Sequence, residues 1–143
     1  MKLYLENLNL VDLISEKHAK LRTMVRNSWA EKGEEPVTDT ESRILALLER
    51  EPLTVSQIAI KIDMSRQGIH KCAQGLISRE YIRVEAIEGN SRDKILLITD
   101  KGIRFCNETL IIKEKFEDDI KKSIGEDNFK ILKETLKETW FTR

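Results

Sequence analysis

The stretch TVSQIAIKIDMSRQGIHKCAQGLISREYIRVEAIEGNSRDKILLITDKG, residues 54–102, decides the fold. Its pattern predicts a short helix, a tight turn, a second helix with a basic start, and two strands joined by a polar turn. This order of elements is typical of a winged helix-turn-helix, in which one helix enters the DNA major groove and a hairpin tip reaches the flanking DNA.

Local signals place the ends of these elements. Thr54 is followed three residues later by Gln57, the spacing of a capping box, and Ser65 offers a cap for the second helix. The short gap between the two helices indicates a helix-turn-helix corner. Residues 82–86 alternate with period two, which predicts a strand with one buried face, and the return strand is expected at 94–98. Residues 53–55 would form a very short strand.

The second helix is expected to turn its polar residues outward. If Ile69, Cys72, Ala73 and Leu76 face the core, a period of 3.6 residues leaves an arginine, a glutamine, a histidine and a lysine on the other face. Arginine pairs with guanine and glutamine with adenine, whereas serine and free helix N–H groups suit phosphate. Simple capping would explain Ser56 and Gln57 equally well. The residues expected to contact DNA here are Ser56, Gln57, Ser65, Arg66, Gln67, Gly68, His70 and Lys71.

The turn between the strands is the second candidate for a DNA contact. Residues 89–94 would form a flexible tip that presents Arg92 to a narrow minor groove, where the negative potential is strongest. Asn90, Ser91 and Lys94 share this tip. The alternative is a polar turn with no partner.

Charge is distributed unevenly along a chain that carries no net charge. Lysine plus arginine equals aspartate plus glutamate at 25 each, yet residues 64–79 contain no acid. This segment holds Arg66, Lys71 and Arg79 together with His70. We therefore expect a local basic face with modest, salt-sensitive affinity for DNA.

The flanking segments are expected to be amphipathic helices. One covers about residues 10–30 and ends at the charged 31–36 stretch; a long helix runs from Thr99 to about Ile124, and a final helix after Gly125 carries apolar residues as far as Trp140. One small core need not absorb all of these apolar faces, so a homodimer is expected. The predicted fold is mostly α with a small β-hairpin, divided into 1–36 (dimerisation), 37–104 (winged helix-turn-helix) and 105–143 (dimerisation).

Other classes of function lack their motifs. Cys72 and Cys106 match no disulfide framework or metal pattern, and the redox role of either is left open. No phosphate loop, nucleophile elbow or zinc-hydrolase motif is present, so neither enzyme activity nor a cofactor or metal is expected. No apolar run is long enough to span a membrane and the N-terminus does not resemble a secretory signal, so a cytoplasmic protein is expected.

A ligand pocket is expected where the terminal helices meet the winged unit. Its candidate lining residues are Tyr4, Met24, Arg26, Trp29 and Phe105. Aromatic residues at helical spacing are also typical of a plain core.

Two motifs together resemble the MarR-type regulators. Residues 64–71 (MSRQGIHK) followed by 76–82 (LISREYI) are similar to the recognition helix and its exit in that family. Residues 90–92 (NSR) and 98–102 (ITDKG) resemble the wing and the start of the next helix. The resemblance implies a homodimer that binds a palindromic operator, usually as a repressor released by a small ligand or by oxidation.

The chain departs from the family pattern in two places. Many relatives have an acid where Asn90 stands, and that acid helps to hold the wing arginine. The first helix also lacks the cysteine of the oxidation-sensing relatives. A winged helix that serves as a protein-interaction adaptor and does not read DNA is the alternative.

Overall fold

A computed structural model describes the backbone of residues 2–142, and the side chains of these residues apart from Lys2, Leu3, Asn90, Ser91 and Arg92. The chain divides into two compact units, Met1–Thr109 and Leu110–Arg143. This division is by compactness, so its boundary at residue 109 does not test the functional division into residues 1–36, 37–104 and 105–143 that the sequence predicted.

The first unit begins with two helices, α1 (Lys2–Glu6) and α2 (Leu10–Glu31). The sequence predicted α2 and missed α1. Asn9 begins α2, because its side-chain oxygen accepts a 2.9 Å hydrogen bond from the backbone N–H of Asp12. Most of α2 is exposed, and Trp29 near its end is buried.

Three helices form the centre of this unit: α3 (Asp39–Arg50), α4 (Val55–Ile62) and α5 (Arg66–Ser78). Thr54 closes a capping box and Ser65 caps α5, as the sequence predicted, and Thr38 closes a second capping box at the start of α3. Asp63 adopts a left-handed conformation (φ +60°), which ends α4 and turns the chain into α5. The helix-turn-helix prediction is confirmed.

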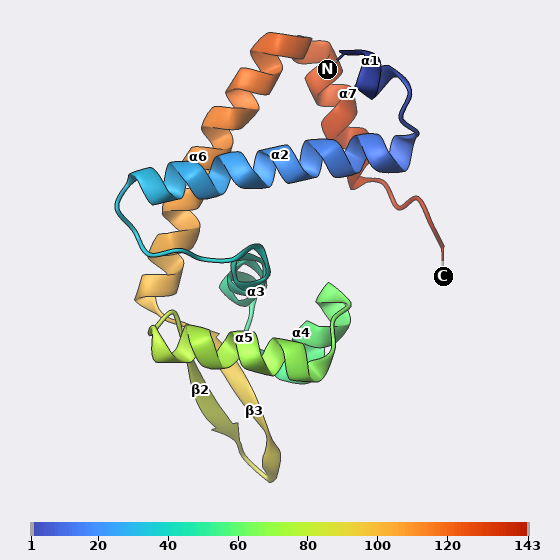
Figure 1. The fold of residues 1–143 in the computed structure, drawn as a ribbon. Helices are drawn as coiled ribbons and strands as arrows, with labels where there is room; N and C mark the ends of the chain where they lie inside the picture. Colours follow the sequence, from blue (N-terminus) through green and yellow to red (C-terminus); the bar gives the residue numbers. More distant parts are fainter. Residues whose placement is uncertain (1, 143) are drawn as a thin grey trace. The chain divides into compact units, whose positions relative to one another are not determined.

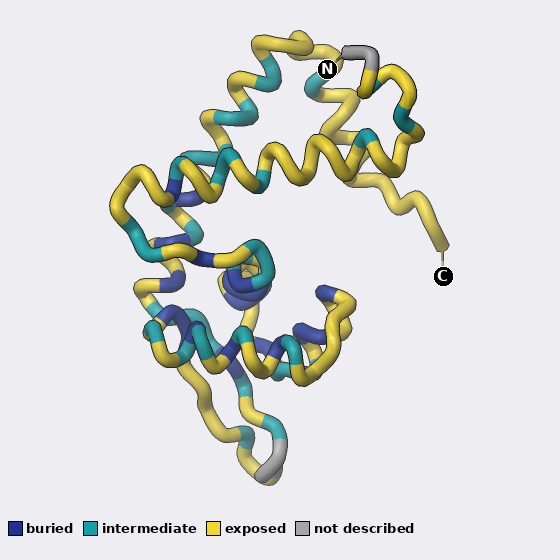
Figure 2. The backbone as a smooth tube through the Cα atoms, viewed as in Figure 1, coloured by how far each residue is buried: buried dark blue, intermediate teal, exposed yellow. Residues whose placement is uncertain are grey.

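The inner faces of these helices meet in one apolar core. Figure 2 shows the buried segments gathered on α3, α4, α5 and the adjoining strands. The large side chains that are fully buried are Ile44, Leu45, Ile58, Ile69, Leu76 and Ile82. Burying a side chain of this size stabilises a fold by roughly 1.5–3 kcal/mol, so the core explains why the three helices hold a fixed arrangement.

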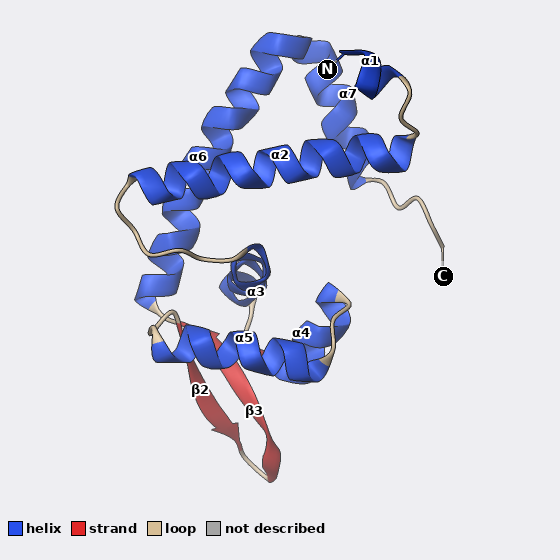
Figure 3. Cartoon of the chain, viewed as in Figure 1, coloured by secondary structure: helices blue, strands red, loops and turns tan. Residues whose placement is uncertain are grey.

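A three-stranded antiparallel sheet completes the unit, with the order β1 (Leu53–Thr54), β3 (Asn90–Ile98), β2 (Ile82–Ile87). Leu96 pairs with both Leu53 and Val84, so β3 is the central strand. Figures 1 and 3 show the β2–β3 hairpin projecting away from α5 as a wing.

Two predictions about the hairpin were wrong. Strand β3 begins at Asn90, which pairs with Ile87, so the turn is confined to Glu88 and Gly89, where Gly89 supplies φ +79°. The next pair is Ala86 with Lys94, so residues 91–93 form an irregularity in the ladder. Strand β2 lacks a fully buried face: Ile82 is buried but Val84 is 40% exposed, because the hairpin extends beyond the core.

Helix α6 (Asp100–Ile124) starts against the base of the wing. Thr99 caps it by accepting a 3.2 Å hydrogen bond from the N–H of Gly102, and its hydroxyl donates to the carbonyl of Glu80 at 2.6 Å. A Cβ at Gly102 would clash with the carbonyl oxygen of Tyr81 and lie 2.5 Å from Cγ1 of Ile98. Glycine is therefore required where the first turn of α6 packs against Tyr81, which follows α5.

The second unit holds the rest of α6 and α7 (Glu126–Lys137), joined at Gly125 with φ +89°. Lys133 on α7 lies 3.5 Å from the carboxylate of Glu117 on α6. The prediction that the final helix reaches Trp140 was wrong: α7 ends at Lys137, and the Trp140 indole donates to the carbonyl of Thr135 at 3.0 Å. None of the residues of α7 is buried.

Between residues 2 and 142, no helix combines the length and apolar character that crossing a membrane demands.

Candidate nucleic-acid interface

One face of α5 carries a row of exposed polar side chains. The backbone N–H of Gly68 donates to the Ser65 hydroxyl at 3.0 Å, which fixes the first turn of the helix. Ile69, Ala73 and Leu76 then face the core. The residues left exposed on the outer face include Arg66, Gln67, His70, Lys71 and Gln74. The structure places the four predicted reading residues together on the surface, whereas Cys72, expected inside, is only half-buried.

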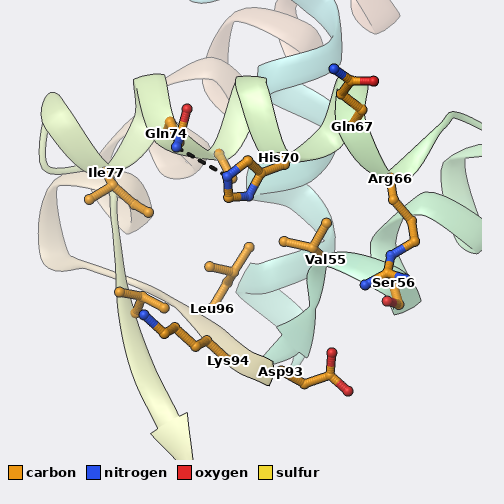
Figure 4. A pocket seen from close by; sticks show the side chains of 12 residues that line it. Val55, Ser56, Arg66, Gln67, His70, Gln74, Ile77, Asp93, Lys94 and Leu96 are labelled. Carbon is orange, nitrogen blue, oxygen red and sulfur yellow. Dashed lines mark hydrogen bonds between the residues drawn. The ribbon is translucent and has the colours of Figure 1, made fainter. Parts of the chain in front are cut away.

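A groove of about 670 Å³ separates this face of α5 from strand β3 and the start of α4. Figure 4 shows His70 and Gln74 on one side of it and Lys94 and Asp93 on the other. Its apolar lining is Val55, Ala73, Ile77, Val84 and Leu96, and its polar lining is Ser56, Arg66, Gln67, His70, Gln74, Asp93 and Lys94. The groove is thus apolar at its base and polar along its edges.

The remaining predicted contacts of the helix-turn-helix have local structural roles. The Gln57 side chain accepts a 2.9 Å hydrogen bond from the N–H of Thr54, and Gln57 does not line the groove. A Cβ at Gly68 would come within 3.1 Å of the Ser65 hydroxyl. A side chain at this position would therefore require the Ser65 hydroxyl to shift by a few tenths of an ångström.

Arg79 does not contribute to the exposed basic face, contrary to the expectation from sequence. Its guanidinium pairs with the Glu41 carboxylate and donates to the carbonyl of Pro36 at 2.9 Å. Because Glu41 neutralises this charge within the domain, the exposed cations of α5 are Arg66 and Lys71 among the described side chains.

The wing can be described only in part. The side chains of Asn90, Ser91 and Arg92 lie outside the described residues, so their predicted contact with a minor groove stays a prediction. Lys94 is exposed and lines the groove.

Gln74 is the residue of this face that sequence reasoning missed. It follows His70 by four residues and Arg66 by eight, so it continues the stripe by two helical turns. Extending the stripe past the basic start of the helix would have found it.

A second, smaller cavity of about 210 Å³ lies beside α2. Arg26, Trp29 and Phe105 line it, as expected for a ligand pocket, but Met24 and Tyr4 do not. The α2 residues that line the cavity are Arg22, Val25, Arg26, Asn27, Trp29 and Ala30, and four of them, Arg22, Val25, Arg26 and Trp29, form one stripe of the helix. Met24 falls beside this i, i+3, i+4, i+7 stripe, which explains the miss. Arg26 pairs with Asp39 at 2.6 Å near the cavity.

A chain of contacts joins this cavity to the end of α5. Trp29 packs edge-on against Phe105, with ring centroids 4.9 Å apart, and its indole N–H donates to the carbonyl of Glu35 at 3.0 Å. The next residue, Pro36, accepts from Arg79, the residue that follows α5. The segment after α2 is therefore attached to both the cavity and α5.

The Glu35 carboxylate strengthens this attachment. Hydrogen bonds from the Tyr81 hydroxyl and from Lys101 lower the pKa of Glu35 below its ordinary value. Burial, and then the bond to Glu35, raise the pKa of Tyr81. The Lys101 ammonium lies 3.0 Å from Glu35 and 4.4 Å from the centre of the Tyr81 ring.

Neither the cysteines nor the carboxylates suggest another site. Burial, followed by the charge of Glu41, raises the pKa of the Cys72 thiol, which disfavours the reactive thiolate. No group of three or more potential metal ligands occurs within the part of the chain that the structure describes.

Comparison with known proteins points to one family. The family model described as the MarR family matches residues 35–93. The HTH-type transcriptional regulator TcaR of Staphylococcus aureus (strain Newman) is 24% identical over 98 residues. That match covers 67% of this chain and 65% of TcaR, so the matched segment spans just under two thirds of the relative.

Solved structures share the fold over most of the chain. A crystal structure of MarR has a TM-score of 0.80 at 21% identity and covers 91% of this chain and 87% of that one. MepR, a transcription regulator of the Staphylococcus aureus multidrug efflux pump MepA, has a TM-score of 0.70 at 15% identity and covers 90% and 94%. YusO of Bacillus subtilis has a TM-score of 0.65 at 19% identity and covers 90% and 95%.

The matched segment, residues 35–93, contains the capped helix-turn-helix and most of the wing described above. Over this segment the sequence is similar to the MarR family, and over most of its length the chain has the fold of solved winged helix-turn-helix structures such as MarR.

Proposed function

We propose that this protein is a DNA-binding transcription regulator, that it acts as a homodimer on a palindromic operator, and that it represses transcription. The observation that carries the proposal is the outer face of α5, which presents Arg66, Gln67, His70 and Lys71 with no acid between residues 64 and 79. These residue types read base edges or bind phosphate. Helix α5 enters the major groove, and the wing, through Arg92, reaches the adjacent minor groove.

The terminal helices support the homodimer. In α2, Leu10 and Val11 are 65% and 73% exposed, and in α7 Ile131 and Leu136 are 63% and 56% exposed. Exposed apolar rows of this kind mark interaction surfaces. A second copy of the chain covers them and places two α5 helices about one turn of DNA apart.

A small-molecule effector fits the cavity beside α2, whose walls combine Trp29 and Phe105 with the cation of Arg26. Ligand sites commonly have such apolar walls and a few polar groups. Because Trp29 and Pro36 connect this cavity to Arg79 at the end of α5, a ligand that displaces Trp29 would move the helix that reads DNA. Release of DNA by such a ligand is the regulation that we propose.

Selection of bound sequences from random duplexes at two salt concentrations tests the proposal. We expect an enriched palindrome and an affinity that falls steeply with salt. In follow-up titrations, Arg66→Ala should relax base preference at one position of each half-site, whereas Lys71→Ala should weaken binding evenly and reduce the salt slope by about one. Binding with no enriched sequence at either salt concentration would contradict the proposal and favour a protein-interaction adaptor.

A further inference from the structure

The stripe of α5 that lines the groove extends beyond the four residues assigned above. Arg66, His70 and Gln74 follow one another at intervals of four residues, and all three are exposed and line the groove. Eight residues of helix cover about 12 Å, and base pairs are stacked about 3.4 Å apart. Gln74 therefore reaches a different base pair from Arg66, farther along the helix.

The amide of Gln74 is held in place by its neighbour. Its nitrogen lies 3.1 Å from Nε2 of His70 (Figure 4), and with the ring proton on Nδ1 this nitrogen accepts a hydrogen bond from the amide. The bond uses one N–H of the amide. The carbonyl oxygen and the second N–H are left as an acceptor and a donor on one planar group.

An acceptor and a donor side by side match one base edge in the major groove. Adenine presents the N7 acceptor next to the N6 amino donor, and a glutamine amide pairs with both. A long side chain fixed before binding also loses less conformational entropy when the complex forms.

We propose that Gln74 is a specificity-determining residue that reads an adenine in each half-site, and that His70 is a positioning residue that orients its amide. The proposal rests on the function proposed above, since it requires α5 to lie in the major groove. It adds a base pair that the basic start of the helix does not reach.

The experiment compares base preference across the operator that selection enriches. The wild-type protein, Gln74→Ala, His70→Ala, His70→Gln and Gln74→Ala/His70→Ala are each titrated against operators carrying every base at each half-site position. Ser78→Ala is the matched control, because Ser78 lies one turn beyond Gln74, is exposed and does not line the groove.

We expect Gln74→Ala to lower the preference for adenine at one position roughly tenfold, within the range of a bidentate contact. His70→Ala should weaken the preference at the same position, and His70→Gln should restore it, because a glutamine carbonyl can accept the same bond across one helical turn. In the Gln74→Ala background, His70→Ala should cause no further loss there. Ser78→Ala should leave every position unchanged.

Two results would overturn the inference while leaving the proposed function intact: an enriched operator whose base preferences survive Gln74→Ala, or a His70→Ala effect confined to other positions. Absence of any enriched operator for the wild-type protein would instead refute the proposed function and this inference with it.

Discussion

The winged helix-turn-helix and the terminal helices use apolar residues in opposite ways. In α3, α4 and α5 the apolar side chains point inward, and Ile44, Ile58 and Leu76 are completely buried. In α7 the residues Leu132 and Leu136 are 46% and 56% exposed, although they recur at the spacing of an amphipathic helix.

The helix-turn-helix covers its apolar residues within one chain, whereas the apolar face of α7 would be covered in the homodimer that we propose. A helix-turn-helix with a complete core can hold its reading face in place by itself. Exposed apolar helices are stable in water when something covers them. The proposed homodimer would therefore separate the recognition of DNA from the assembly that sets the distance between two copies of α5.

The strongest test of this contrast shortens one apolar side chain in the core and one on the exposed face of α7. Leu76→Ala should lower the free energy of unfolding by about 2–5 kcal/mol, because it leaves a cavity in a fully buried site. Leu136→Ala should cost less, and its cost should depend on protein concentration. Urea denaturation at two protein concentrations measures both. A similar, concentration-independent loss for the two variants would contradict the contrast.

Charge placed on α7 tests whether its apolar face is an interface. The double variant Leu132→Glu/Leu136→Glu should change a dimeric protein into a monomer, because a buried unpaired charge is costly, while most of its helical circular dichroism remains. Analytical ultracentrifugation reports the change, with Lys130→Glu on the same exposed helix as the control. A monomeric wild-type protein at tens of micromolar would remove the basis for the proposed homodimer.

The base of the wing should tolerate change less than the middle of α5. Gly102→Ala should destabilise the protein by roughly 1–3 kcal/mol, because its Cβ would overlap the carbonyl oxygen of Tyr81. Gly75→Ala is the matched control: its Cβ would lie 3.6 Å from Oε2 of Glu41, an ordinary contact, and alanine favours a helix. In thermal denaturation the melting temperature of Gly102→Ala should be well below that of Gly75→Ala. Equal melting temperatures would contradict the close approach of α6 to Tyr81.

The smallest expected effect concerns the acid dependence of the Glu35 attachment. Hydrogen bonds from Tyr81 and Lys101 lower the pKa of Glu35 in the folded state, so their contribution is present above the ordinary carboxyl value of 4.5 and is lost as the pH falls through the folded value. Glu35→Gln should therefore be less stable than wild type at pH 7, and the gap should close at pH 3. Urea titrations at both pH values measure it, with exposed Glu114→Gln as control; a gap that persists at pH 3 would contradict this origin.

Much of the fold could be predicted because its signals are local. Thr54 with Gln57, and Ser65 before its helix, are caps that act within one turn, and the inner face of α5 follows from helical periodicity alone. The order of these short motifs resembles that of MarR-type regulators, and this resemblance predicted the architecture of the winged helix-turn-helix. The outward position of Arg66 and Lys71 followed from the same periodicity.

The incorrect predictions concern residues whose position depends on contacts with segments far away in the sequence. Val84 alternates like a half-buried strand residue, but no other element covers that part of the hairpin. Arg79 belongs to the basic segment by sequence, yet Glu41, 38 residues earlier in the chain, binds it. The end of α7 before Trp140 likewise depends on packing that no short pattern encodes.

The central claim, that two copies of α5 read two half-sites from a fixed distance, is tested most directly by changing that distance. Five base pairs inserted between the half-sites of the selected operator rotate one half-site by about half a turn of DNA. We expect affinity to fall to that of a duplex with a single half-site, measured by titration at one salt concentration. Affinity unchanged by the insertion would contradict a rigid dimer that holds two readers in register.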